Sequence, residues 1–191
     1  MGTNIGNMFR FRDDRMDQIR KSDGKSWQPY SVLNFNGQLA IGHYPTGSLY
    51  AYDGESLAPF KPPIPVPSKA SSRAREAQTL AIHQGDLYAG VWPWGELWRF
   101  DSEARQWTLV QRLFGSPKVS REGNEPFARQ MQGKSGDYNY WGQRITSLVN
   151  FGDALYIGTM NKRGRPFTDE HDFLDAKTVA QYGRVFRLRT G

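Results

Sequence analysis

The sequence contains no cysteine, and this absence removes several kinds of chemistry. The chain cannot form disulfide bonds, use a thiol as a nucleophile, or hold a metal ion through sulfur. Its 3 histidines, His43, His83 and His171, lie far apart in the sequence, so no metal site is expected. No phosphate-binding loop, dinucleotide-binding glycine motif or G-x-S-x-G turn is found, and no cofactor is expected.

Long apolar runs are also missing. No stretch of about 18 apolar residues occurs, so we expect neither a membrane-spanning helix nor a membrane partner. The first residues, MGTNIGNMFRFRDDR, contain no apolar core of a secretory signal. If the chain is a piece of a longer protein, this says little about its compartment, and a secreted or periplasmic location stays open.

Dense blocks of one charge are absent as well. The 191 residues carry a net charge of +6, but Lys and Arg are interspersed with Asp and Glu along most of the chain, so a nucleic-acid partner is not expected. Aromatic residues, in contrast, are abundant at 14%, and there are 20 glycines and 11 prolines. This composition is typical of an all-β chain with many short strands and turns.

A short pattern recurs along the chain: a glycine, a polar residue, an aliphatic residue, an aromatic residue, a variable residue, then an aromatic residue or Leu. Its copies are GNMFRF from Gly6, GSLYAYD from Gly47, GELWRFD from Gly95 and GRVFRL from Gly183. Three copies follow a turn glycine, a short apolar run and a second glycine; the pairs are Gly37 and Gly42, Gly85 and Gly90, and Gly152 and Gly158. The chain therefore repeats a larger unit.

Each unit predicts four antiparallel strands, which we call a, b, c and d. A tight glycine turn joins a to b, as in a β-hairpin. A repeated unit of four strands over about 45 residues is typical of a β-propeller blade. Ser31, Thr79 and Thr146 each lie six residues before the turn glycine of their unit, so we align the units on them. A β-sandwich also has many short strands, but it would not repeat four of them in register.

The strands amount to a partial ring of about three and a quarter blades, in the order c-d, a-b-c-d, a-b-c-d, a-b-c. We expect a half blade in residues 4–30, whole blades in 31–60 and 77–113, and an incomplete blade in 144–189. Closed propellers have about 4–8 blades. The remaining blades or a second copy would be needed to close the ring. We favour a segment of a larger propeller, because two copies would place strand c twice at the seam.

Two motifs resemble known propeller families. Phe100, Asp101 and Trp107 are similar to the second half of a kelch repeat, and Tyr52 and Asp53 match it in the preceding unit. The run SDGKSW, Ser22 to Trp27, resembles the end of an Asp-box, the turn between strands c and d in sialidase-like propellers. The resemblance to the sialidase-like and galactose-oxidase-like propeller superfamily implies the propeller fold. Kelch-like members mostly bind proteins, a few relatives are oxidases or sugar-processing enzymes, and sialidase-like members bind or cleave glycans.

The long connections all fall at one end of the expected propeller. They are residues 61–76, 114–143 and 160–182, and they join strand d to a or strand b to c. The last contains DFLDAKTVAQY, which has helical periodicity. Long loops around one mouth of a compact domain are typical of a binding site. We therefore predict the ligand site at this long-loop mouth.

Two groups of mouth residues are candidates for ligand binding. The ring-bearing group can stack on sugar rings: His43, Tyr44, Trp92, Trp94, Tyr140 and Trp141. The charged group consists of Arg75, Glu76, Arg112, Arg144 and Lys162. A cluster of its arginines can hold a carboxylate or phosphate. The alternative for both groups is structural, with the rings packed against the neighbouring blade and the charges paired between blades.

The function we expect is binding of a glycan or another polar or anionic ligand at the long-loop mouth. The first alternative is a kelch-like scaffold that binds proteins. The second is part of a sialidase-like glycan hydrolase or lyase. Such a hydrolase requires three arginines, an acid and a Tyr–Glu nucleophile pair, and the sequence does not assign them. No catalytic residue is therefore named, and an enzyme is not expected from this chain alone.

Overall fold

The computed structural model describes residues 2–67, 74–121, 123–134, 140–162 and 167–189. This part of the chain forms 13 strands in four antiparallel sheets. The first two sheets are β1 (Met8–Arg12) and β2 (Arg15–Arg20), then β3 (Gln28–Phe35), β4 (Gln38–Tyr44), β5 (Leu49–Tyr52) and β6 (Leu57–Pro59). The last two are β7 (Glu76–His83), β8 (Asp86–Trp92), β9 (Glu96–Asp101) and β10 (Gln106–Arg112), then β11 (Gln143–Phe151), β12 (Ala154–Asn161) and β13 (Val185–Arg189).

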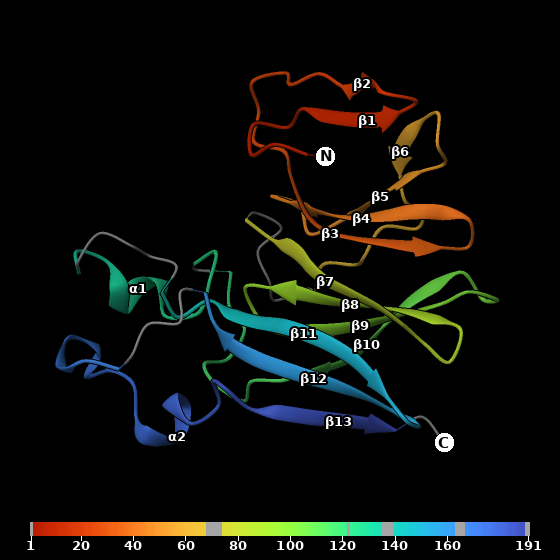
Figure 1. The fold of residues 1–191 in the computed structure, drawn as a ribbon. Coiled ribbons are helices and arrows are strands. Elements are labelled where there is room, and N and C mark those ends of the chain that lie inside the picture. Colours follow the sequence, from red (N-terminus) through yellow and green to blue (C-terminus); the bar gives the residue numbers. More distant parts are fainter. Residues whose placement is uncertain (1, 68–73, 122, 135–139, 163–166, 190–191) are drawn as a thin grey trace.

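These sheets form a partial β-propeller of four-stranded blades, so the predicted fold class is confirmed. The sheets follow one another in chain order from β1–β2 to β11–β13, with neighbouring strands paired in sequence order within each (Figure 1). β7 contacts β3 on one side and β11 on the other, which places the first strands of three blades side by side. The strand order c-d, a-b-c-d, a-b-c-d, a-b-c is the observed one.

The connections differ sharply between the two ends of the strands. Tight hairpin turns lie at one end, and the short helices α1 (Ala128–Met131) and α2 (Ala176–Val179) lie at the other (Figure 1). A 3-10 turn, η1 (Asp169–His171), precedes α2. The helical periodicity of residues 172–182 is confirmed by α2, whose first turn is capped by the Asp175 carboxylate, 2.6 Å from the Thr178 amide. No helix of the described residues is long and apolar enough to cross a membrane.

The hydrophobic core lies between successive sheets. One cluster joins Phe35 and Leu49 of the second sheet to Leu87 and Phe100 of the third. Another joins the third sheet to the fourth, and a smaller one joins β1–β2 to the second. The recurring aromatic residues Tyr52, Trp98 and Phe100 of the third strands therefore pack between blades, whereas Phe11 of the first copy is exposed.

The alignment of the last unit is corrected by one residue. Ser31 pairs with Gly42 and Thr79 with Gly90, whereas the residue opposite Gly158 is Ser147 and not Thr146. The reason is the hairpin turn. Gly37 and Gly85 occupy the second of two turn positions, but Gly152 occupies the first, so counting from the turn glycine shifts the strand by one.

The residues that resemble family motifs serve local turns. The Asp53 carboxylate accepts the amides of Glu55 and Ser56 at 2.9 and 2.7 Å, and these bonds lower its pKa to about 2. Asp101 closes the equivalent turn in the next sheet. The SDGKSW run lies between β2 and β3, in the connection from strand d to strand a. The Asp-box resemblance would place it between strands c and d, so the two positions differ.

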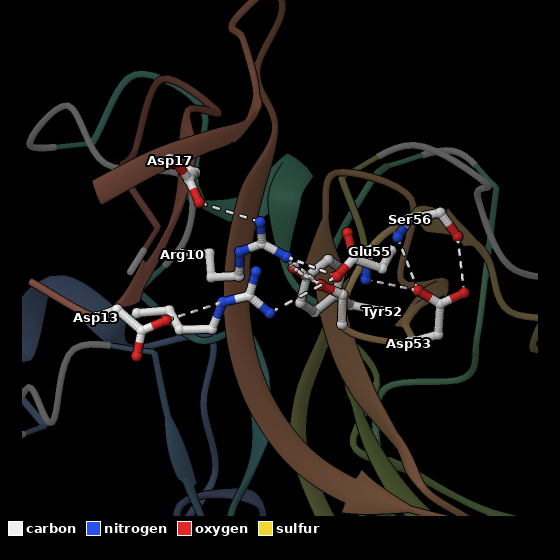
Figure 2. A network of polar contacts seen from close by, with 9 residues as sticks. Arg10, Asp13, Asp17, Tyr52, Asp53, Glu55 and Ser56 are labelled. Atoms are coloured by element: carbon white, nitrogen blue, oxygen red, sulfur yellow. Dashed lines mark hydrogen bonds and ion pairs between the residues drawn. The ribbon is translucent and has the colours of Figure 1, made fainter. Parts of the chain in front are cut away.

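Ion pairs join the first strand pair to the second sheet at the hairpin end. Figure 2 shows Arg10 between two carboxylates, 3.0 Å from Asp17 Oδ2 and 3.2 Å from Glu55 Oε1. The hydrogen bond to Asp17 raises the pKa of Arg10 further above its usual range. Arg99 occupies the same position of the repeat but pairs within its own sheet, 2.5 Å from Asp86. The contacts of this arginine position therefore change from blade to blade.

Candidate functional site

Two equivalent loops of the predicted mouth fasten each whole blade to the next. The carbonyl of Pro45 accepts the Arg75 amide at 2.8 Å, and the carbonyl of Pro93 accepts the Gln143 amide at 2.9 Å. Parallel bridges form beside these bonds, between Thr46 and Arg75 and between Trp94 and Gln143. Tyr44 and Trp92 end the strands that lead into these loops, and Trp94 lies in the second loop, so all three adjoin the contacts between blades.

Most ring-bearing candidates are buried in these contacts. Trp92, Trp94 and Trp141 are 1–2% exposed, and His43 and Tyr140 are buried as well. An added Cβ at Gly142 would overlap the indole of Trp92, so the backbone lies directly against this ring. The Trp141 ring packs against His171 and Tyr182, with centroids 5.0 and 5.4 Å away. These rings therefore follow the packing alternative, and their faces are not open to a sugar.

His43 lines a cleft between β1–β2 and the second sheet. Its ring is 5.0 Å from the Trp27 ring, and its Nδ1 lies 2.8 Å from Thr46 Oγ1. Burial first, and then the charge of Arg20, lower the pKa of His43 to about 4. The imidazole is therefore neutral at pH 7.

Two of the charged candidates, Arg75 and Arg112, form ion pairs or hydrogen bonds inside the structure. Arg75 is buried and forms an ion pair of 2.7 Å with Glu96, which also accepts the indole N–H of Trp98 at 2.8 Å. Arg112 donates to the Trp94 carbonyl at 3.0 Å and to Gln143 Oε1 at 2.7 Å. Burial lowers the pKa of Arg112 to about 10. Arg75 thus forms its ion pair with the sheet that it precedes, and Arg112 is bonded to neutral groups, so neither forms the ion pair between blades that the structural alternative expects.

The other charged candidates meet around Glu76, the first residue of β7. Its carboxylate is buried, with Oε2 2.8 Å from Arg144 Nη2 and Oε1 3.1 Å from Lys162 Nζ. The side chains of Arg144 and Lys162 remain 15% and 20% exposed. Lys162 Nζ also lies 4.4 Å from the centroid of the Trp92 ring. A partly exposed positive pair therefore shares one buried carboxylate.

Two tyrosines of the preceding blade complete this group. Tyr30 and Tyr44 have ring centroids 6.3 Å apart. Burial first, and then the charge of Glu76, raise the pKa of both phenols, so both stay protonated near neutral pH. We call Tyr30, Tyr44, Glu76, Arg144 and Lys162 the Glu76 cluster. It brings together residues of three successive sheets.

Several buried hydrogen-bond donors lack a partner within the described structure. The buried indole nitrogens of Trp92, Trp94 and Trp141 have no acceptor within the described structure, and neither does Arg144 Nε. Deeper in the structure, Arg75 Nε and Nη1 and one oxygen of Glu96 also lack partners. Apart from that oxygen, these orphaned groups are donors. Of these groups, Arg144 Nε belongs to the Glu76 cluster, where the side chain of Arg144 is 15% exposed.

The sequence therefore predicted part of this arrangement. Tyr44, Glu76, Arg144 and Lys162 meet in one cluster, with Trp92 beside it. Tyr30 was missed, although it lies near the start of strand a, the position that drew attention to Glu76 and Arg144. Among the described residues, no group of His, Asp and Glu is placed to hold a metal ion.

Two further clefts flank the propeller segment. One, of about 640 Å³, lies between β1–β2 and the second sheet and is lined by Arg20, Trp27, His43 and Tyr50. The other, of about 590 Å³, lies between β10 and β13 and is lined by Arg112, Lys177, Thr178 and Arg184. In the second cleft Gln181 bonds to the Gly115 amide and to Ser116, so much of the polar lining is internally paired.

No protein-family model matches the sequence, and no curated protein is detectably similar to it.

Proposed function

We propose that this propeller segment binds a polar, anionic ligand, such as an acidic glycan, at the long-loop mouth. The observation that carries the proposal is the pair of partly exposed cations, Arg144 and Lys162, at the Glu76 cluster. Arg144 and Lys162 share the single carboxylate of Glu76, and both keep part of their side chains exposed. A ligand carboxylate or sulfate would pair with the exposed parts of these two cations.

The tyrosines give the same site its affinity for hydroxylated ligands. Tyr30 is 38% exposed, and burial and the charge of Glu76 raise the pKa of its phenol further above neutral pH. A phenol with an apolar ring and a hydroxyl offers a stacking surface and a hydrogen-bond partner to a sugar. Tyr30 and Tyr44 thus take the role that the sequence suggested for the buried tryptophans.

Binding is a better match to this chemistry than catalysis. A sialidase-like mechanism uses a tyrosine activated by a glutamate that takes its proton. Here both oxygens of the Glu76 carboxylate are held in ion pairs, with Arg144 and with Lys162. The raised pKa of Tyr30 also opposes formation of a phenolate nucleophile. These two features favour a ligand site over the hydrolase alternative.

The first test is calorimetric titration of the chain with an acidic oligosaccharide, oligogalacturonate, and with a neutral one of similar length, cellotetraose. We expect the acidic sugar to bind and the neutral sugar to bind at least tenfold more weakly, since the charged contacts are lost. Equal affinity for both sugars, or no binding of the acidic one, would contradict the proposal. Binding of a protein in place of the sugar would support the kelch-like scaffold.

Variants locate the site. Arg144→Gln and Lys162→Gln should each weaken binding of oligogalacturonate by about tenfold. The matched control is Arg15→Gln, which removes the same charge from an exposed position on β2 at the hairpin end. The control should bind as the unchanged chain does. If it loses as much affinity as the cluster variants, binding depends on the overall charge and not on the Glu76 cluster.

A further inference from the structure

A hydrogen bond across a glycine recurs between successive blades. The Ser31 hydroxyl donates to the Ala77 carbonyl at 2.9 Å and passes over Gly42. The Thr79 hydroxyl donates to the Ile145 carbonyl at 3.1 Å and passes over Gly90. A Cβ on Gly42 would overlap the Ala77 carbonyl, and one on Gly90 would lie 2.7 Å from Ile145 Cβ. The glycine is therefore needed to let the next blade approach.

The acceptor of this bond has a constant place in the next blade. Ala77 lies two residues before Thr79, and Ile145 lies two residues before Ser147. β7, the first and inner strand of its blade, thus accepts a bond from the preceding blade and donates one to the following blade. The rule defines what a partner strand must offer: a backbone carbonyl at this position, with no large side chain opposite the glycine.

The last sheet repeats the donor half of this arrangement. Ser147 lies opposite Gly158 in the register of Ser31 and Gly42. An added Cβ on Gly158 would meet only atoms of its own sheet, chiefly those of Ser147. Within the described residues, the Ser147 hydroxyl donates to no carbonyl of a following blade. The donor, the glycine and the acceptor carbonyl are therefore all present at two contacts between blades, whereas the last sheet shows the donor and the glycine.

The apolar residues around Ser147 and Gly158 in the last sheet are exposed, whereas the residues at the same positions of earlier sheets are buried. Phe151, opposite Ala154 at the hairpin, is 75% exposed, while Phe35 at the same position of the second sheet is 5% exposed. Val185, opposite Gly158, is 72% exposed, while Leu97, opposite Gly90, is 1% exposed. Val149, which lies on β11 together with Phe151, is 54% exposed. The face has the composition of a blade contact.

We propose that this face, formed by Ser147, Val149, Phe151, Gly158 and Val185, docks a further propeller blade. The inner strand of that blade accepts the Ser147 hydroxyl through a backbone carbonyl, as Ala77 and Ile145 do. Phe35 meets Phe100 edge to face at 6.2 Å, so the partner carries an aromatic residue on its third strand opposite Phe151. The occupant is a blade that begins with an inner strand.

A second copy of this chain, joined head to tail, does not offer such a strand. The first sheet of a copy is β1–β2, which holds strands c and d and no inner strand. It has no carbonyl in the place of Ala77 or Ile145. The face therefore selects a complete blade over the first sheet of another copy.

The chain itself supplies a probe. Leu155 pairs with Leu188 and Leu87 with Phe100, so Arg189 occupies the position of Asp101. An extended chain is made by placing a second copy of residues 102–189 directly after Arg189. The added part begins with the turn into strand d and ends with strands a, b and c of a new blade. Hydrogen exchange is measured on the extended chain and on the 191-residue chain.

We expect the added inner strand and the amides of residues 147–151 to become protected in the extended chain. Phe151→Asp should lower its thermal midpoint by about 5 °C or more, because a charge is then buried. The same change should alter the midpoint of the 191-residue chain little, since Phe151 is exposed there. Val32→Asp is the matched control, because Val32 is also an exposed strand residue but faces away from the added blade.

Several outcomes would overturn the proposal. Added residues that stay unprotected would show that the face takes no blade. Equal effects of Phe151→Asp in both chains would show that docking does not bury this residue. Light scattering on the 191-residue chain gives a third check. A discrete dimer that Phe151→Asp dissociates would make a second copy the occupant of the face.

Discussion

The third and fourth sheets carry the same pattern, yet their matching residues have opposite surroundings. Leu97 lies opposite Gly90 and is 1% exposed; Val185 lies opposite Gly158 and is 72% exposed. Both are aliphatic residues at the start of a third strand. The difference is the neighbouring sheet, which covers Leu97 and is absent beside Val185 within the described structure. Burial in this fold is therefore a property of the contact between blades and not of the single blade.

The largest expected effect comes from truncating these two residues. Leu97→Ala should lower the free energy of unfolding by about 3 kcal/mol, because it removes buried methyl groups and leaves a cavity. Val185→Ala should change it by less than about 0.5 kcal/mol, because the side chain is already in water. Urea denaturation of both variants measures the difference. Similar losses for the two would mean that Val185 is covered in solution.

Substituting the equivalent glycines Gly90 and Gly158 should give a smaller difference in the free energy of unfolding. Gly90→Ala should cost about 2 kcal/mol of unfolding free energy, since the new methyl group meets Ile145 of the next sheet. Gly158→Ala should cost clearly less, because the methyl group meets chiefly the Ser147 side chain, which can rotate away. The same denaturation series tests this. An equal cost would place the strain inside each sheet and remove the role of the glycine in blade approach.

The hydroxyl groups should show a still smaller difference. Thr79→Val removes the bond to the Ile145 carbonyl and should cost about 1 kcal/mol. Ser147→Ala removes a hydroxyl with no acceptor on a following blade in the described structure, and its effect should lie near zero. The difference disappears if the Thr79 bond is not formed in solution. Amide exchange at residues 145–147 provides an independent measure of that bond.

The smallest expected effect concerns His43, at the contact between the first strand pair and the second sheet. It is a change in how the free energy of unfolding depends on pH. The pKa of His43 in the folded chain is about 4, below the usual 6.5, because burial disfavours the charged ring. Between these values the unfolded chain binds more protons, so stability should fall as the pH drops from about 6.5 towards 4. His43→Gln should remove that part of the fall while leaving the part due to carboxylates. Unfolding curves at pH 7 and pH 4.5 compare the two chains.

Much of the fold was accessible from the sequence because its signals are local. Glycine turns, short apolar runs and the recurring aromatic pattern each depend on a few adjacent residues. The one-residue error at Ser147 arose where this locality failed. Gly152 occupies a different turn position from Gly37 and Gly85, and only the pairing with strand β12 reveals it.

The site was less accessible, because ring and charge positions do not reveal what faces them. Trp92 and Trp94 were placed in the correct loops, but the backbone at Gly142 and the side chain of Arg112 cover them. Arg75 and Glu76 are neighbours in sequence, yet they pair with Glu96 in one case and with Arg144 and Lys162 in the other. Tyr30 was recognised as part of the site only because the structure places it near Glu76, whose charge raises the pKa of its phenol.

Strand order, sheet size and the succession of blades follow from the amino-acid pattern, because hairpins form between neighbours in sequence. Which of the repeated side chains are buried, and which charges pair, follows from the packing of one sheet on the next. Those contacts join residues 46 to 86 positions apart, such as Ser31 with Ala77 and Glu76 with Lys162. No local pattern encodes such a meeting, so the tertiary structure alone decided where the Glu76 cluster and the open blade face lie.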